Sequence, residues 1–394
     1  MNTKKKIGCV LAVRRRNHNN YGTSLQAYAT VKVLQDLDYE VCIIRKNFSR
    51  SLIDSLKLVP IYWKNGAKGE MLINLNKKIC GLFLKKFKKN NEIRNKSVEE
   101  FKESFFEPLC KYYTTYDELR EGSKEYNLCL TGSDQLWHPM GFASAFYNLM
   151  FVDDDIPKIS YASSFGVSEI PEHQLAGTKE YLERFNWISV REEKGKEIVE
   201  TVSNAKADFV CDPTMLLTKE QWEDYAKSSK QSIKEPYIFC YFLGERKDIR
   251  EQALELQKKT GCKIVMMRHV DKYLSFDDNF GDFAPYDVSP IDFVNLLKNA
   301  EHVLTDSFHG TIFSIMMEKK FITFYRVKPS TKGSTHSRID SLLNKFELQN
   351  RIYRKDIYNQ AIAEINYAEI KSKVEEFRNK SSELLKTNIK KYIK

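Results

Sequence analysis

The sequence has few residues that break or cross-link a chain, and it has no long apolar segment. It contains 16 glycines and 10 prolines among 394 residues, which excludes collagen-like and low-complexity chains. The eight cysteines are scattered and form no CxxC pair, so they predict reduced thiols rather than a disulfide framework or a structural zinc site. No apolar run approaches the roughly 20 residues that cross a bilayer, and no secretory cleavage site follows the first residues. We expect a soluble, cytoplasmic globular protein.

Four catalytic signatures are also missing. The sequence contains no GxxxxGK[ST], GxGxxG, HExxH or GxSxG motif, which disfavours the enzyme classes that depend on them. Three adjacent carboxylates, Asp153 to Asp155, stand in a turn before Pro157. Because such runs are usually solvated, we predict no metal site.

The positive charge is concentrated in two stretches. The formal net charge is +10, yet residues 76–96 carry eight Lys or Arg against one Glu, and residues 380–394 carry five Lys against one Glu. The remainder is near neutral, which argues against a nucleic-acid-binding surface. On a helix, the apolar residues within 76–96 would form one side flanked by lysines. Such a helix either rests on an anionic membrane or covers a lobe of the protein.

Strand and helix patterns alternate along the chain, which predicts an α/β fold with two lobes. Residues 1–220 form a first Rossmann-like lobe with a basic helical insertion at about 50–125. A second Rossmann-like lobe spans 235–350, and residues 355–394 form a helical extension. The cleft between two such lobes is the expected ligand site.

The segment EHVLTDSFHG predicts a strand that carries polar residues at its C-terminal end. Asp306, Ser307 and His309 follow the apolar part, and Gly310 lets the next helix start close to a ligand. A histidine has an ordinary pKa of about 6.5, so it can accept or donate a proton near neutral pH. The alternative is structural: Asp306 or Ser307 caps the helix, and His309 is only hydrogen-bonded.

Two segments of the first lobe are further candidates for binding. Asn20, Tyr21 and Gly22 precede a helix whose free N–H groups can receive an anion, although Asn and Gly also suit any turn. In LTGSDQLWHP, Asp134 and Trp137 lie behind a strand end. They either hold a polar ligand or form a turn around a buried tryptophan.

Arginines supply the candidate anion-binding groups. Arg191, in SVREEKG, ends an apolar strand, where its guanidinium can bind a carboxylate or phosphate through two hydrogen bonds. The alternative is a surface salt bridge with Glu192 or Glu193. Arg338 and Arg268 are two further cations that belong either to the surface or to the site.

Six segments, in this order, resemble the polysaccharide pyruvyl transferase family: NYGTSLQAYA, GSDQLWHP, YASSFG, SVREEKG, DPTMLL and DSFHGTIFSI. The match spans about residues 7–345. The resemblance implies a GT-B-like pair of Rossmann-type lobes. It also implies transfer of a pyruvyl group from phosphoenolpyruvate, the co-substrate, to a sugar of a bacterial surface or extracellular polysaccharide. The product is usually a cyclic ketal, and no metal or other cofactor takes part.

The resemblance also implies residue roles. His309 would be the catalytic acid or base. The donor would be bound by Arg191, Asp306, Ser307, Gly310 and Arg338. The acceptor, a sugar or lipid-linked glycan, would be bound by Asn20, Tyr21, Gly22, Ser133 and Asp134. Characterised members carry an Arg two positions before the histidine, where this chain has Ser307, so Arg338 or Arg268 would have to supply that positive charge.

Two other functions stay open at this stage. A GT-B glycosyltransferase with a nucleotide-sugar donor would use the same lobes. A non-catalytic glycan-binding relative would explain the serine at position 307. For the enzyme we expect a cytoplasmic location, with peripheral contact at the inner face of an anionic membrane, and no nucleic-acid partner; the sequence predicts no particular oligomeric state.

Overall fold

Two parallel β-sheets form the body of the protein. The structure, a computed structural model, describes residues 4–13, 20–47, 85–269, 272–327 and 336–394. The strands of the first sheet are β1 (Lys6–Val10), β2 (Glu40–Lys46), β3 (Cys110–Tyr113), β4 (Leu128–Thr131), β5 (Lys158–Ser163), β6 (Trp187–Val190) and β7 (Ala207–Phe209). Those of the second sheet are β8 (Tyr237–Tyr241), β9 (Lys263–Met267), β10 (His302–Thr305) and β11 (Lys320–Thr323). The strand orders are β3-β2-β1-β4-β5-β6-β7 and β11-β10-β8-β9, and neighbouring strands pair in parallel.

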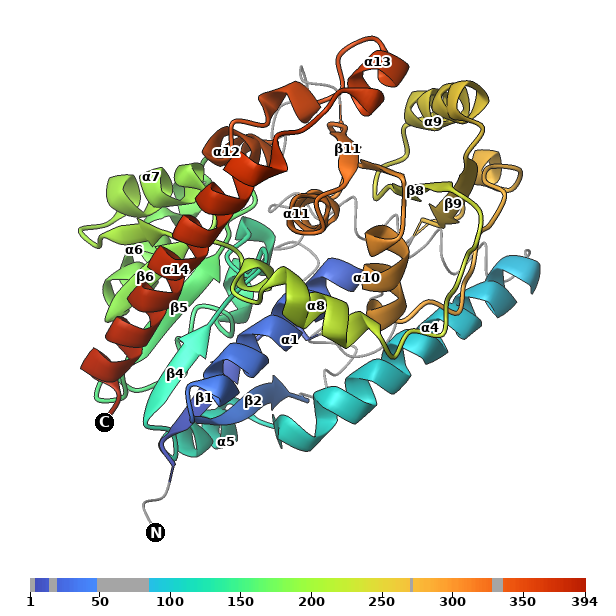
Figure 1. The fold of residues 1–394 in the computed structure, drawn as a ribbon. Helices are drawn as coiled ribbons and strands as arrows, with labels where there is room; N and C mark the ends of the chain where they lie inside the picture. Colours follow the sequence, from blue (N-terminus) through green and yellow to red (C-terminus); the bar gives the residue numbers. More distant parts are fainter. Residues whose placement is uncertain (1–3, 14–19, 48–84, 270–271, 328–335) are drawn as a thin grey trace.

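Helices cover the sheets (Figure 1). Before β8 they are α1 (Tyr21–Asp36), α4 (Lys85–Phe105), α5 (Tyr116–Ser123), α6 (Leu175–Glu183), α7 (Glu193–Val202) and α8 (Lys219–Ala226). After β8 they are α9 (Lys247–Thr260), α10 (Pro290–Lys298), α11 (Phe308–Met316), α12 (Ser337–Lys345), α13 (Ile357–Ile362) and α14 (Tyr367–Tyr392). Side chains determine where several of them begin: Thr218 and Ser289 form capping boxes at α8 and α10.

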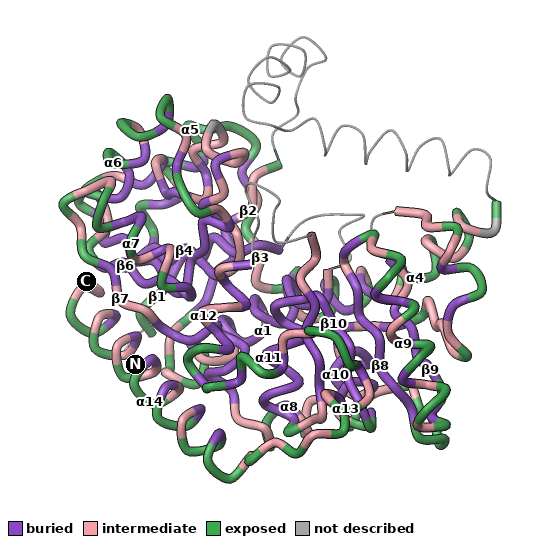
Figure 2. Tube along the Cα trace, turned by 90° about the horizontal axis from the view of Figure 1, so that it is seen from above, coloured by how far each residue is buried: buried purple, intermediate pink, exposed green. Residues whose placement is uncertain are grey.

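The central strands are apolar on both faces because helices cover both sides of each sheet. All residues of β4, β8 and β10 are buried, as expected for parallel strands between two helical layers. Figure 2 shows these buried strands inside an outer layer of partly exposed helices. This layering places the polar residues that follow the strands at the sheet edges.

The predicted fold class is confirmed: two Rossmann-type α/β lobes in a GT-B-like pair, followed by a helical C-terminal extension. The first sheet lies within residues 1–220 and the second within 235–350. One part of the expected insertion differs, because β3 lies inside 50–125 but pairs with β2 and so belongs to the first sheet. Residues 48–84 of that expected insertion lie outside the described part of the chain.

An aromatic cluster joins the two lobes. Trp222 of α8 is fully buried, and its ring lies 5.7 Å from Tyr28 of α1 and 5.0 Å from Phe313 of α11. Tyr21 at the start of α1 stacks on Phe293 of α10, with ring centroids 5.1 Å apart. The apolar core therefore continues from the first lobe into the second beside the site described below.

Two long helices also cross between the lobes (Figure 1). The first turn of α4 lies on the second lobe, where Phe87 contacts Tyr273 at 5.4 Å between ring centroids. Its last turn lies on the first lobe, where Phe105 lies 4.6 Å from Tyr28. Helix α4 thus connects the lobes along one side.

Helix α14 returns from the second lobe to the first. Near its start, Tyr367 donates a hydrogen bond to the backbone of Ser314 in α11. Farther along, Arg378 donates to the carbonyl of Met215 at 2.8 Å, and Ser381 accepts from the amide of Cys211 at 3.0 Å. The C-terminal extension is therefore part of the cover of the first sheet.

Among the described residues, no helix is both long enough and apolar enough to cross a bilayer. Of the basic stretch 76–96, the described part begins at residue 85 and forms the first half of α4, with Lys85, Lys88 and Lys89 exposed. The second basic stretch ends α14, on the opposite side of the molecule in Figure 1. Contact with an anionic membrane and a cytoplasmic location stay predictions.

Candidate active site between the lobes

Polar residues at the ends of strands from both lobes meet at one place. The first lobe contributes Ser133 and Asp134 after β4, Arg191 after β6 and Asp212 after β7. The second lobe contributes His309, in the first turn of α11 after β10. Parallel strands present their C-terminal ends at one edge of a sheet, which explains why residues so distant in sequence converge.

His309 and Asp212 form one of the contacts between the lobes at this site. Nε2 of His309 lies 3.5 Å from Oδ2 of Asp212, a polar contact that is longer than a hydrogen bond, and this buried nitrogen has no hydrogen-bond partner. The histidine is 6% exposed and the aspartate 2%. Oδ1 of Asp212 accepts hydrogen bonds from the amide and the hydroxyl of Thr214. The carboxylate is thus held from its own loop and is able to orient the imidazole.

Arg191 lies between two carboxylates. Its Nη1 donates to Asp212 Oδ2 at 2.7 Å and its Nη2 donates to Asp134 Oδ1 at 3.0 Å. Ser133 donates its hydroxyl to Asp212 at 3.2 Å, and Thr23 donates to the second oxygen of Asp134 at 2.7 Å. The guanidinium is buried, so the ion pair that its Nε forms with Oε2 of Glu192, at 4.0 Å, lies inside the protein and not at the surface as the alternative expected.

The network that Arg191 forms with Asp134 and Asp212 keeps both of these aspartates ionised. Burial alone would raise the pKa of Asp212, but His309 and Arg191 outweigh it and hold that pKa far below the ordinary value. Burial opposes ionisation of Asp134 too, and Arg191 again outweighs it and lowers the pKa of that carboxyl. The same two carboxylates overcome the burial of Arg191 and raise its pKa. Arg191 is therefore mainly engaged within the protein, and its predicted donor contact stays a prediction.

The start of α1 packs against the imidazole. Oδ1 of Asn20 accepts a hydrogen bond from the amide of Gly22 at 3.1 Å, which caps the helix. A Cβ added at Gly22 would lie 2.2 Å from Nδ1 of His309, so only glycine allows this approach. The structure thus places Asn20, Tyr21 and Gly22 beside the predicted catalytic residue.

The residues around His309 in its own motif shape the backbone. Asp306 accepts hydrogen bonds from the amides of Leu243 and Gly244 after β8, at 2.6 and 2.8 Å. Ser307 caps α11 by accepting from the amide of Gly310 at 3.3 Å. A Cβ added at Gly310 would lie 2.4 Å from Oγ1 of Thr305. These contacts match the structural alternative for Asp306 and Ser307, and donor binding by Asp306, Ser307 and Gly310 stays a prediction.

Arg338 is a buried cation without a carboxylate partner. It is 7% exposed, and it makes no hydrogen bond or ion pair with any residue that the structure describes. Its guanidinium carbon lies 5.8 Å from the ring centre of Phe308, whose ring also lies 4.7 Å from Arg191. Burial and repulsion by Arg191 lower the pKa of Arg338 to about 10, although Glu192 partly compensates.

Two further residues of this region carry unsatisfied buried atoms. Nε of Arg326, just after β11, has no hydrogen-bond partner. Oε2 of Glu192 is also buried and has no hydrogen-bond partner; Nε of Arg191 lies 4.0 Å from it, and burial raises the pKa of that carboxyl despite this cation. Arg268, the other candidate substitute for the missing family arginine, donates to the carbonyl of Asp278 at 3.3 Å.

Other expectations from the sequence concern metal binding and Trp137. Asp153 and Asp154 accept hydrogen bonds from Arg120 and Arg184. Within the described ranges, no group of three or more His, Cys, Asp or Glu side chains is arranged to hold a metal ion; the absence of a metal stays a prediction.

Trp137 follows the structural alternative that was considered for the LTGSDQLWHP segment. Its indole N–H donates a hydrogen bond to the carbonyl of Tyr147 at 3.3 Å.

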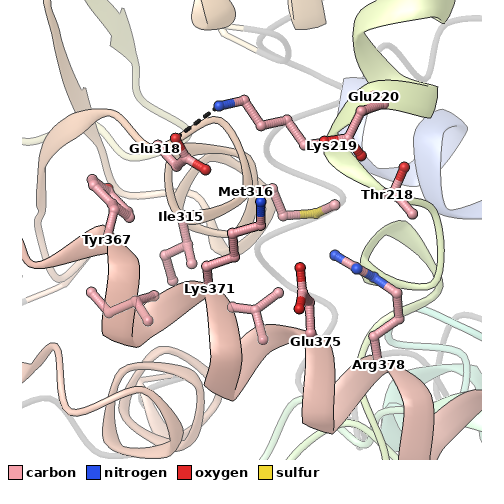
Figure 3. Close-up of a pocket in the computed structure, with 12 residues that line it drawn as sticks. Thr218, Lys219, Glu220, Ile315, Met316, Glu318, Tyr367, Lys371, Glu375 and Arg378 are labelled. Atoms are coloured by element: carbon pink, nitrogen blue, oxygen red, sulfur yellow. Dashed lines mark hydrogen bonds and ion pairs between the residues drawn. The ribbon is translucent and has the colours of Figure 1, made fainter.

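A separate cavity of about 100 Å³ lies at the opposite end of α11 from His309 (Figure 3). Helices α8, α11 and α14 line it, and Lys219 and Glu318 form an ion pair at 2.8 Å across its rim. None of the predicted site residues lines this cavity. It is distinct from the candidate active site.

The sequence interpretation assigned no role to Asp212 or Arg326, although it placed the segment around Asp212 at a strand end of the kind where ligands bind. The segment ADFVCDPTMLL was interpreted as a strand closed by Asp212 and Pro213, and KFITFYR as a strand ending near Arg326. The available signal was position, because both residues follow parallel strands at the edge where ligands bind.

Comparison with known proteins identifies the family. The family model for polysaccharide pyruvyl transferase matches residues 20–327. A search of curated proteins gives no significant match. Among solved structures, MnaA of S. aureus with UDP is 13% identical, with TM-score 0.49 and coverage of 98% of this chain and 96% of that chain. UDP-GlcNAc 2-epimerase from Neisseria meningitidis bound to UDP-GlcNAc is 13% identical, with TM-score 0.46 and coverage of 98% and 100%. Because the family match covers most of the chain, this protein belongs to the polysaccharide pyruvyl transferase family.

Proposed function

We propose that this protein transfers a pyruvyl group from phosphoenolpyruvate to hydroxyl groups of a sugar acceptor in polysaccharide assembly. Family membership supports the reaction class. The observation that carries the proposal is the pairing of His309 from one lobe with Asp212 from the other, 3.5 Å apart. A histidine oriented by a buried carboxylate is suited to proton transfer.

The reaction needs a proton to be removed from a sugar hydroxyl and a proton to be added to the methylene carbon of the enolpyruvyl group. One hydroxyl oxygen of the sugar bonds to the central carbon of the donor as the methylene carbon takes up the proton. A second hydroxyl oxygen of the same sugar then displaces inorganic phosphate from that carbon, its proton leaves with the phosphate, and the ketal is complete. Nδ1 of His309 is covered by Gly22, whereas Nε2 lies 3.5 Å from Asp212 and has no hydrogen-bond partner, so Nε2 would exchange the proton with substrate. The acceptor would lie along the first lobe beside the start of α1, where the family resemblance places its binding residues.

The donor would bind on the side of Arg338. Phosphoenolpyruvate carries a carboxylate and a phosphate, so it needs cations that are not already neutralised. Arg338 and Arg326 meet this condition better than Arg191, which two aspartates hold. They would replace the arginine that family members carry at the position of Ser307.

The acceptor would be a sugar or a lipid-linked glycan, with the exposed lysines at the start of α4 directed toward an anionic membrane. Purified protein, phosphoenolpyruvate and candidate glycans test the whole proposal. We expect phosphate release that depends on the acceptor, and a product whose mass increases by one pyruvyl group. Turnover of a nucleotide sugar instead would establish the glycosyltransferase alternative, and glycan binding without turnover of any donor would establish a non-catalytic protein.

Replacing Arg338 by glutamine is expected to raise the KM for phosphoenolpyruvate by about 10- to 100-fold, because charge-assisted hydrogen bonds to an anion are lost. The unliganded variant should be at least as stable as the wild type, since an uncompensated buried charge is removed. Steady-state kinetics and thermal unfolding measure both effects. The exposed Arg354, which directly follows the second lobe, serves as the control when it is changed to glutamine. An unchanged donor KM in Arg338→Gln would remove this residue from the donor site.

Replacing Gly22 by alanine is expected to lower kcat by about 100-fold, because the new methyl group displaces the imidazole of His309 and misplaced groups lose catalytic efficiency. Gly141→Ala is the matched control, since the nearest atom to its added Cβ is 4.0 Å away. Phosphate-release kinetics of the two folded variants check the prediction. Equal kcat values for Gly22→Ala and wild type would show that this contact does not position His309.

A further inference from the structure

Another uncompensated guanidinium lies near the start of α1, beside Tyr21. Arg94, in the middle of α4, is 1% exposed, and its Nε and Nη2 atoms have no hydrogen-bond partner. The remaining nitrogen, Nη1, donates to the carbonyl of His269 at 3.0 Å. Its guanidinium carbon lies 4.9 Å from the ring centre of Tyr286. No carboxylate in the described part of the chain forms an ion pair with it.

Tyr21 presents a matching unsatisfied group. It is 1% exposed, and its hydroxyl has no hydrogen-bond partner. Burial raises the pKa of Tyr21 to about 12, and the charge of Arg94 and a side-chain contact with it oppose this rise. The phenol and the guanidinium therefore face the same small region between α1 and α4.

The acidic groups near this region are committed elsewhere or exposed. Oδ1 of Asp292 accepts from the hydroxyl of Ser229, and Oδ2 accepts from Ser289. Asp287 is exposed to solvent. A buried cation without a counter-charge is costly unless a ligand neutralises it. The two free guanidinium nitrogens form the donor geometry that fits a planar carboxylate or a phosphate.

We propose that Arg94 and Tyr21 bind an oxyanion group, a phosphate or a carboxylate, carried by the acceptor. Tyr21 directly precedes Gly22, which contacts His309, so an anion held here lies on the acceptor side of the imidazole, whereas Arg338 lies beside Phe308. The assignment of the anion to the acceptor rests on the proposed function; the anion site itself does not. The acceptor would then be an acidic or phosphate-linked glycan rather than a neutral sugar.

Calorimetric titration tests the site without any turnover. Inorganic phosphate, pyrophosphate and acetate are titrated into Arg338→Gln protein, in which one of the two proposed donor cations is absent. We expect at least one of these anions to bind. Tighter binding of phosphate or pyrophosphate would identify the natural group as a phosphate, and tighter binding of acetate would identify it as a carboxylate. Adding Arg94→Gln should weaken this binding by about 10-fold or more, and adding Tyr21→Phe, which keeps the ring, should weaken it several-fold.

Arg351→Gln is the matched control, because Arg351 is also buried but donates to the carbonyls of Gln360 and Ala363 in the C-terminal extension. Arg94→Lys keeps a positive charge if Arg94→Gln does not fold. Equal anion affinity with and without the Arg94 and Tyr21 substitutions, or no binding of any of the three anions, would overturn the site. In active enzyme, Arg94→Gln should raise the KM for the acceptor and leave that for phosphoenolpyruvate unchanged; the reverse pattern would overturn the assignment to the acceptor.

Discussion

Replacing His309 by glutamine is expected to lower the rate of phosphate release from phosphoenolpyruvate by about 10²- to 10⁴-fold, the usual contribution of a positioned acid or base. Glutamine keeps a polar side chain of similar length but cannot exchange a proton near neutral pH. Because Asp212 is held by Thr214 and Arg191 as well, the variant should stay folded. Acceptor-dependent phosphate release at saturating donor measures the effect.

His302 provides the matched control for this substitution. It lies at the start of β10, seven positions before His309, and is also buried, at 8% exposure. His302→Gln should keep kcat within a few-fold of the wild type. If His309→Gln turned over substrate as fast as His302→Gln, proton transfer would have to be assigned to another group, and the proposed mechanism would fail.

Replacing Arg191 by glutamine is expected to lower the free energy of unfolding by about 3 to 5 kcal/mol, because the buried carboxylates of Asp134 and Asp212 both lose a partner. Urea unfolding monitored by circular dichroism measures the change. Arg120→Gln is the control, since its ion pair with Asp153 involves a side chain that is 60% exposed and should contribute at most about 1 kcal/mol. A loss as small as that of Arg120→Gln would show that the network does not stabilise the fold.

The same network predicts how stability depends on pH. The pKa values of Asp134 and Asp212 are lowered in the folded protein. A carboxyl with a lowered folded-state pKa contributes stability above its unfolded pKa, about 3.9 for Asp, and loses that contribution as the pH falls further. We expect the free energy of unfolding to decrease below about pH 4 in the wild type. The decrease should be shallower in Arg191→Gln, and parallel curves would contradict this explanation.

The fold was predictable because its signals are local. Apolar strands such as residues 237–241 end in polar residues and are followed by amphipathic helices, and this alternation repeats in both lobes. The motif around His309 could be found for the same reason, since it directly follows β10. Strand β3 was missed because its four residues, CKYY, alternate between partly exposed and exposed positions before one buried tyrosine.

The partners within the site were not predictable, because they depend on how distant segments pack. The sequence predicted that Arg191 is free to bind an anion. Its guanidinium instead donates hydrogen bonds to Asp134, 57 positions away, and to Asp212, 21 positions away. Arg94 was interpreted as one charge in a basic run. Its helical spacing from Val98 and Phe101, both buried, was the signal that it faces inward.

The return of α14 to the first lobe affects how the protein can be divided. Phe377 and Ile389 of this helix are buried, and Ser381 closes a hydrogen bond to the amide that precedes Asp212. A fragment that stops near residue 350 would lack α14. The apolar surface that α14 covers on the first lobe would then be exposed, and the loop that holds Asp212 would lose a hydrogen bond. Expression of either half alone should give aggregation-prone material, because the cooperative folding unit includes both ends of the polypeptide.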